Sequence, residues 1–259
     1  MSMKKEILPY RILLAVFALF LLISMLTASL AETERGDLNE RFSDEITVEY
    51  ADIVYRLRDR LTTVMFAGFA ADDAGEYVPE MLLLLAVNDN EKLMSPIWIE
   101  CALLPEYIPI YKDVAAEFIE IEGVDIRCEE LLGMANALMP AELIEHYIAL
   151  DLASLELLDG LDTPNYTERI KALKAQLEQS SSEQLDEMFD RMSGHIVTDM
   201  KSGALIKIAD KAERYDRRPT VRFVKQPDID NPDDSEVAYS QDAMLEFAVK
   251  VFFEEKQIW

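Results

Sequence analysis

The side chains best suited to nucleophilic or metal chemistry are scarce in this sequence of 259 residues. There are two cysteines, Cys101 and Cys128, and two isolated histidines, His146 and His195. No CxxC pair and no Cys/His group at zinc spacing occurs, so a zinc site or a histidine-based nucleophile has little to build on. An oxidising compartment would permit a disulfide, but the spacing of the cysteines does not decide between a disulfide and two buried thiols.

Motifs for phosphate binding and for hydrolysis are also missing from the sequence. The eight glycines follow neither a Walker nor a Rossmann spacing, and there is no G-x-S-x-G elbow. The acidic stretch DIDNPDDSE, residues 228–236, lacks the sixth-position glycine and the twelfth-position glutamate of an EF-hand. It is therefore interpreted as a solvated loop.

The net charge of the chain limits the classes of molecule that it can bind. The formal net charge is -25. Lys4, Lys5 and Arg11 against Glu6 give residues 1–31 a net charge of +2, which leaves -27 for the remainder. A surface this acidic repels nucleic acid and anionic lipid headgroups, which argues against a nucleic-acid-binding role. It is compatible with cationic partners or divalent ions, and also with a role in solubility alone.

The beginning of the chain predicts export. Residues 12–30 form an uncharged apolar run that follows basic residues, long enough to cross a hydrocarbon core of roughly 30 Å as a helix. The basic flank should stay in the cytoplasm and the acidic stretch after the run should lie outside. Ser29 and Ala31 also suit signal peptidase, so cleavage after Ala31 and secretion is the alternative to an uncleaved signal anchor. The anchor is favoured because the run is longer than a usual signal-peptide core.

After a polar tether at residues 32–44, hydrophobic periodicity predicts alternating strands and helices in one domain, 45–259. Residues 81–87 and 92–100 should form a hairpin around a turn at 88–90, with Pro96 requiring an edge position or a bulge. The predicted strands are 62–67, 81–87, 92–100, 146–150 and 220–224. The predicted helices are 45–61, 126–138, 152–158, 166–178, 182–192, 205–212 and 243–253.

This order of elements predicts an α/β fold, namely a three-layer α-β-α domain with a mixed central sheet, preceded by one N-terminal transmembrane helix. The run MLLLLAV, Met81–Val87, is continuous and apolar, as expected of a central strand buried on both faces. Successive leucines in this strand should point to opposite helical layers.

Three stretches together resemble the LytR-CpsA-Psr family of bacterial cell-envelope proteins, in a divergent, clostridial-type form. They are residues 76–100, which resemble the family's hairpin, residues 127–161, which resemble its helix-strand-helix segment, and residues 195–215, which resemble its C-terminal part. The resemblance implies that the chain relates to proteins that move a glycopolymer from a polyprenyl-pyrophosphate carrier onto peptidoglycan. That chemistry would use arginines on the pyrophosphate and an aspartate that holds a magnesium ion.

The sequence departs from the family pattern at the residues that would carry this chemistry. Glu80 stands at the place of the metal-binding aspartate, where it could keep an oxygen ligand for magnesium. Cys101, preceded by Glu100, stands where the family's arginine is expected. Arg169 and Lys171 are the nearest basic residues in the later helical segment. A pyrophosphate would be poorly bound without an arginine clamp, so the resemblance implies the fold more strongly than the activity.

The leading hypothesis is a membrane-tethered, extracytoplasmic pseudoenzyme with a binding or accessory role in cell-wall glycopolymer attachment. Its partner would be a polyprenyl-linked glycan or a cell-envelope protein. No cofactor is assigned to it, and magnesium would be the cofactor if the chain is active. The alternative is a divergent, magnesium-dependent phosphotransferase that uses Glu80, Arg169 and Lys171. A third hypothesis is a generic membrane-tethered interaction domain.

Overall fold

A computed structural model describes residues 46–71, 76–104, 110–111, 118–152, 194–201, 204–205, 207–208, 211, 214–227 and 235–256. The predicted anchor and tether lie outside these residues, as do the predicted helices at 166–178 and 182–192 with the candidate site residues Arg169 and Lys171. None of the helices in the described part of the chain is long and apolar enough to cross a membrane.

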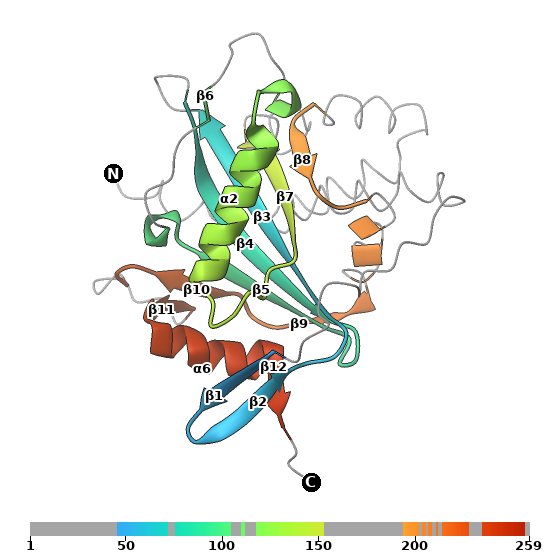
Figure 1. Ribbon diagram of the computed structural model, residues 1–259, viewed down its shortest axis with the longest axis vertical. Coiled ribbons are helices and arrows are strands. Elements are labelled where there is room, and N and C mark those ends of the chain that lie inside the picture. The colour runs from blue at the N-terminus through green and yellow to red at the C-terminus, as the bar shows by residue number, and fades with distance from the viewer. Residues whose placement is uncertain are drawn as a thin grey trace.

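The described residues form an α/β domain around a mixed sheet, as the sequence predicts (Figure 1). Along the sheet, β3 pairs antiparallel with β4 and parallel with β7, while β5 pairs antiparallel with β4 and parallel with β10. The described strands, in spatial order, are β11 (Glu236–Ala238), β10 (Val221–Val224), β5 (Leu93–Ile99), β4 (Glu76–Asn88), β3 (Leu61–Ala71), β7 (His146–Asp151) and β8 (Ile196–Thr198), with β6 (Ile110–Tyr111) beside β4 and β9 (Asp216–Arg217) beside β5.

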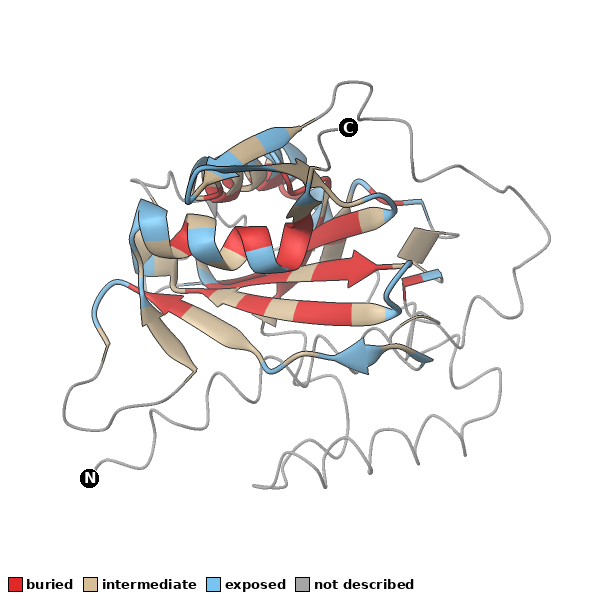
Figure 2. Cartoon of the chain, turned by 90° about the horizontal axis from the view of Figure 1, so that it is seen from below, coloured by how far each residue is buried: buried red, intermediate tan, exposed pale blue. Residues whose placement is uncertain are grey.

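The predicted central strand is confirmed, and its leucines alternate between two cores. Leu82 and Leu84 belong to the core cluster on the side of the helices α2 (Val124–Ala137) and α6 (Gln241–Phe252). Leu83 belongs to the cluster on the other side, which also contains Met200 and Ile208. Figure 2 shows α2 and α6 on the same side of the sheet. The run Met81–Val87 within β4 (Glu76–Asn88), which is apolar at every position, is stable here because both faces of the sheet are covered.

The two described helices form as their sequences predict. In α2 the buried residues Val124, Cys128, Leu131 and Ala135 recur at helical spacing and face the sheet. The helix α6 begins after Ser240, whose Oγ accepts a hydrogen bond of 3.1 Å from the backbone N–H of Ala243, as expected of an N-cap.

The predicted helix over residues 45–61 is wrong. This segment forms the strands β1 (Thr47–Tyr50) and β2 (Ile53–Leu57), which make a three-stranded sheet with β12 (Phe253–Glu255). The turn between them consists of Ala51 and Asp52, both with positive φ, as in two-residue hairpin turns. Exposure alternates along β1, and β-branched residues favour strands, so the period is two and not 3.6.

Pro96 lies in an interior strand of the sheet, not in an edge strand, but one side of the strand has no paired residue at this position. Pro96 faces Leu85 of β4 on one side. On its other side β5 pairs with β9 at residues 93–94 and with β10 at residues 97–99. Proline lacks an amide hydrogen, and it is accommodated at the step where β5 changes partners.

Two glycines provide a matched test of packing. A Cβ on Gly68 in β3 would lie 2.6 Å from Leu152 Cδ2 and 3.0 Å from Met81 Cβ, whereas a Cβ on Gly133 in α2 would meet nothing within 4 Å. We expect Gly68→Ala to lower the free energy of unfolding by about 1–3 kcal/mol because the core is overpacked. Gly133→Ala should raise it by up to about 1 kcal/mol because alanine favours a helix. Urea denaturation of both variants measures the difference, and equal effects would contradict the packing of β3.

Candidate functional site

The strand directions bring several polar residues to one edge of the sheet. Since β3, β5, β7 and β10 run in the same direction, their carboxyl ends meet there, next to the amino end of the antiparallel β4. We call this edge the carboxyl edge; its residues are Gly68–Ala71, Glu76–Glu80, Glu100–Cys101, Asp151 and Lys225. Ligand sites of open α/β sheets commonly lie at such an edge.

Glu80 lies in a β-bulge at the carboxyl edge. Met81 pairs with Gly68 and Pro79 pairs with Phe69, so Glu80 is the extra residue of β4 and has no partner residue on β3. Its side chain is exposed. Bulges are common next to functional sites, where they change the direction of a side chain.

Cys101 begins a short 3-10 helix, η1 (Cys101–Leu103), directly after β5. Burial, and then the negative charges of Glu80 and Glu100, raise the pKa of its thiol to about 12. The thiol is therefore neutral near pH 7. Glu80 and Cys101 are the two described positions that the family resemblance singles out. They come from different parts of the sheet, β4 and the end of β5, and the structure brings them together. Both described cysteines are free, so they do not pair with each other, and Cys128 is a buried residue of α2.

Glu100 has a structural role at the carboxyl edge. Its carboxylate accepts a hydrogen bond of 2.6 Å from the backbone N–H of Lys225, and its own N–H donates to the carbonyl of Phe223 at 2.9 Å. These bonds fix the end of β5 against the end of β10. The Glu100 charge still acts on Cys101, where it adds to the charge of Glu80.

A second polar cluster at the carboxyl edge was not predicted from the sequence. Asp151 is only 3% exposed, and its Oδ2 lies 3.1 Å from the hydroxyl of Tyr77 and 3.3 Å from Nδ1 of His195. Burial and then Asp151 raise the pKa of Tyr77 to about 12, so its hydroxyl keeps its proton and donates to the carboxylate. The other histidine, His146, is likewise 3.0 Å from an aspartate, Asp199. Neither histidine is therefore isolated in the fold.

The remaining candidates were predicted to bind magnesium or phosphate. Among the described residues, no group of three or more histidine, cysteine, aspartate or glutamate side chains is arranged to hold a metal ion. Magnesium binding by Glu80 therefore stays a prediction, and so do the roles of Arg169 and Lys171, which lie outside the described residues.

The raised pKa of Cys101 predicts low thiol reactivity with a defined cause. Only the thiolate reacts with iodoacetamide, so at pH 8 we expect alkylation of Cys101 on the order of a thousand times slower than that of a cysteine with the ordinary pKa of roughly 8.5. Glu80→Gln removes one of the raising charges and should accelerate the reaction severalfold. Peptide mapping by mass spectrometry after timed alkylation measures both rates.

Cys128 provides the internal control for this experiment. Burial, followed by Asp125 and Glu129, raises its pKa to about 12, and Glu80 is not among the causes. Its alkylation rate should be unchanged in Glu80→Gln, and equal acceleration of both thiols would indicate loosening of the fold instead.

The raised pKa values of Cys101 and Cys128 also predict how stability depends on pH. The folded state keeps the thiol protons that the unfolded state releases above roughly pH 8.5, so thermal stability should fall as the pH rises above this value.

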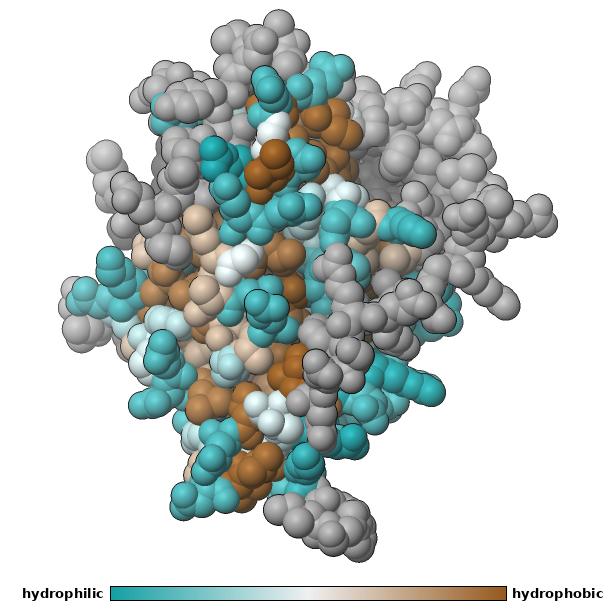
Figure 3. All heavy atoms as spheres, in the orientation of Figure 1, coloured by the Kyte–Doolittle hydropathy of each residue, from teal (hydrophilic) through white to brown (hydrophobic). Residues whose placement is uncertain are grey.

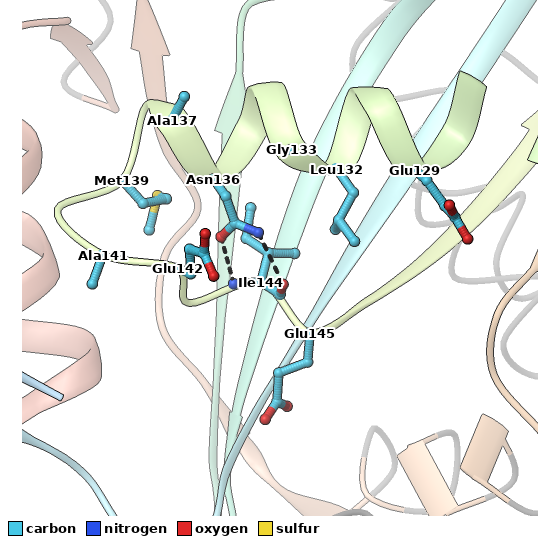
Figure 4. A pocket seen from close by; sticks show the side chains of 10 residues that line it. All are labelled: Glu129, Leu132, Gly133, Asn136, Ala137, Met139, Ala141, Glu142, Ile144 and Glu145. Atoms are coloured by element: carbon cyan, nitrogen blue, oxygen red, sulfur yellow. Dashed lines mark hydrogen bonds between the residues drawn. The ribbon is translucent and has the colours of Figure 1, made fainter. Parts of the chain in front are cut away.

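A pocket of about 610 Å³ lies beside the second half of α2, away from the carboxyl edge (Figure 4). It is bounded by the helix and by the loop that leads to β7, and its described lining contains no lysine, arginine or histidine. Figure 3 shows this side of the molecule, where hydrophilic and apolar residues are interspersed. The lining residues are Glu129, Leu132, Gly133, Asn136, Ala137, Met139, Ala141, Glu142, Ile144 and Glu145.

Comparison with models of known protein families and with curated proteins finds no match. Among solved structures, the chain is similar to TagV from Bacillus subtilis, at 10% identity and a TM-score of 0.39, over 75% of this chain and 98% of TagV. It is similar to the Lin1025 protein from Listeria innocua, at 9% identity and a TM-score of 0.37, over 64% of this chain and 83% of Lin1025. For TagT bound to LI-WTA the identity is 9% and the TM-score 0.35, over 64% of this chain and 79% of TagT.

Proposed function

We propose that this chain is a membrane-tethered, extracytoplasmic domain similar to the LytR-CpsA-Psr family that has lost transferase chemistry and has a binding or accessory role in cell-wall glycopolymer attachment. Residues 12–30 would anchor it, and a cleaved, secreted form is the alternative. The observation that supports the loss of chemistry is the environment of Cys101, where two carboxylates and a neutral thiol occupy the place expected for an arginine.

The electrostatic potential at Cys101 is the physical reason for the proposed loss of transferase chemistry. Glu80 and Glu100 both raise the pKa of Cys101, which means that the potential at this thiol disfavours an added negative charge. A pyrophosphate would meet the same potential. Transition-state charge on a departing phosphate needs preorganised cations, and loss of one such group typically costs about 3–4 kcal/mol, or a few hundredfold in rate.

One observation favours the alternative of a divergent magnesium-dependent phosphotransferase. Glu80 is exposed on its bulge, so its carboxylate is accessible to a metal ion that a phosphate substrate would bring. In this alternative the cations would come from Arg169 and Lys171, and magnesium would offset part of the charge.

A transfer assay separates the two functions. The full chain is incubated with a polyprenyl-pyrophosphate-linked glycopolymer and peptidoglycan, with and without magnesium, and the attached polymer is measured. We expect no magnesium-dependent transfer above background. Binding of the glycopolymer is measured in parallel, and the accessory role predicts that it is retained in Glu80→Gln. Magnesium-dependent turnover that disappears in Glu80→Gln would overturn the proposal in favour of the phosphotransferase.

A further inference from the structure

His195 is held at the carboxyl edge through both its backbone and its side chain. Its carbonyl accepts a hydrogen bond of 3.0 Å from the N–H of Asp151, the last residue of β7, and its Nδ1 lies 3.3 Å from Oδ2 of the same aspartate. The preceding residue, Gly194, accepts a hydrogen bond of 3.0 Å from the N–H of Ile119. The position of the imidazole is therefore set before any ligand binds, which is what proton transfer at a defined place requires.

The contacts of Asp151 fix which nitrogen of His195 carries the proton. The hydroxyl of Tyr77 donates to Oδ2 of Asp151 over 3.1 Å, and the ring of Tyr77 packs edge-on against Phe118, with the ring centroids 5.3 Å apart. A carboxylate only accepts hydrogen bonds, so Nδ1 of His195 is the donor in its contact with Asp151. In the neutral imidazole the lone pair then lies on Nε2.

The pair of Asp151 and His195 is buried on one side and accessible on the other. The side chain of Asp151 is 5% exposed, whereas that of His195 is 26% exposed. Because Nδ1 faces the buried carboxylate, the exposed part of the ring is its far side, which carries Nε2. An oriented proton acceptor thus lies at the edge where ligand sites of open α/β sheets are common.

We propose that His195 is a general base and that this end of the carboxyl edge hydrolyses uncharged carboxylic esters. Nε2 takes a proton from a water molecule while the water oxygen forms a bond to the ester carbonyl carbon. The bond from that carbon to the alkoxy oxygen then breaks, and the proton passes from Nε2 to the departing alcohol, so that one ester and one water give one carboxylic acid and one alcohol. Asp151 is a positioning residue that also stabilises the imidazolium formed in the first step.

The charges at the carboxyl edge argue for an uncharged substrate. Glu80 and Glu100 raise the pKa of Cys101, so this edge disfavours anionic substrates such as phosphate esters. An uncharged ester brings no charge, and in the transition state the positive charge on His195 balances the negative charge that develops on the substrate. The inference goes beyond the proposed function and does not depend on it, because it concerns an ester beside Asp151 and not a pyrophosphate beside Cys101.

The other histidine provides the matched control. His146 begins β7, at the opposite end of the strand from Asp151. Its Nδ1 lies 3.0 Å from Oδ2 of Asp199, but the side chain of Asp199 is 23% exposed and its Oδ1 accepts a hydrogen bond of 2.9 Å from the N–H of Tyr147. This pair therefore ties the residue after β8 to the start of β7, away from the carboxyl edge.

The test follows the hydrolysis of p-nitrophenyl acetate, an uncharged ester, by the full chain near neutral pH. We expect saturable turnover that is slower in D2O than in H2O, because a general base moves a proton in the transition state. His195→Gln should lower kcat/KM about a hundredfold or more, since general acid–base catalysis typically contributes about 10²–10⁴-fold. His146→Gln should stay within about threefold of the parent chain. Equal losses in the two variants, or turnover by the parent chain with no isotope effect, would overturn the proposal.

Two further variants separate a base from a residue that only stabilises the fold. Asp151→Asn keeps the shape of the side chain but removes the charge beside the imidazolium, so it should lower kcat at least tenfold. In His195→Gly, added imidazole should restore hydrolysis above the rate of imidazole alone, because the free base can take the proton in place of the lost ring. Circular dichroism checks that each variant is folded. Full activity in a folded Asp151→Asn variant, or no rescue of a folded His195→Gly variant, would refute a catalytic role of His195.

Discussion

Leu83→Asp is expected to abolish folding, with the full chain losing its cooperative thermal transition. Leu83 is 3% exposed and lies on β4 between Phe66 of β3 and Trp98 of β5. An unpaired carboxylate at this position would be taken out of water without a partner, at a cost of several kcal/mol. Domains of this size are stable by only about 5–15 kcal/mol in total. Differential scanning calorimetry and solubility after refolding measure the outcome.

Two control variants separate burial of charge from substitution itself. Leu83→Met conserves volume and should cost less than about 1.5 kcal/mol. Val54→Asp introduces the same charge at a position in β2 that is 37% exposed, where surface substitutions usually change stability by about 0.5 kcal/mol or less. A soluble Leu83→Asp variant with a cooperative transition would contradict the central position of β4.

Much of the sheet could be predicted because its signals are local. The run of leucines in β4, the turn at residues 88–90 and the strand β5 specify a hairpin through adjacent residues. The helix α2 is specified by apolar spacing, although Gly133 lowers its helix propensity. Strands β7 and β10 were also predicted at the observed positions. In each case the hydrophobic period and the element length agree.

The failure over residues 45–61 has a physical reason as well. Tyr50, Ile53, Val54 and Leu57 satisfy a helical spacing, but the same residues satisfy two strands joined by Ala51 and Asp52. The strand form is stabilised over the helix by β12, which is distant in sequence and pairs with β2. Tertiary pairing of this kind overrides the local pattern, and the β-branched residues were the signal that favoured strands.

The candidate site, too, depends on tertiary pairing that the local sequence does not specify. The family resemblance singled out Glu80 and Cys101 separately, and only the fold shows that the charge of Glu80 acts on Cys101. The cluster of Tyr77, Asp151 and His195 was missed, since its members are separated by 74 and 44 residues and meet only through strand pairing and the return of the chain. A buried aspartate at the end of a strand was the available signal, because such a carboxylate requires partners.

A single substitution can introduce a positive charge at the carboxyl edge. Cys101→Arg should bind a polyprenyl-pyrophosphate analogue at least tenfold more tightly than the parent chain. The substitution replaces a neutral thiol by a guanidinium beside Glu80 and Glu100, whose charges already act at this point. A charge-assisted hydrogen bond contributes about 1.5–3 kcal/mol, and about 1.4 kcal/mol corresponds to tenfold in affinity.

Cys101→Gln is the matched control, because it adds a polar side chain without charge and should leave the affinity unchanged. The gain in Cys101→Arg should shrink as salt is raised, since screening weakens an electrostatic contact at a partly exposed edge. Affinities are measured by calorimetry, with thermal midpoints recorded to verify folding. An equal gain in Cys101→Gln, or no gain in a folded Cys101→Arg variant, would mean that pyrophosphate does not bind at this edge and that the family resemblance extends to the fold alone.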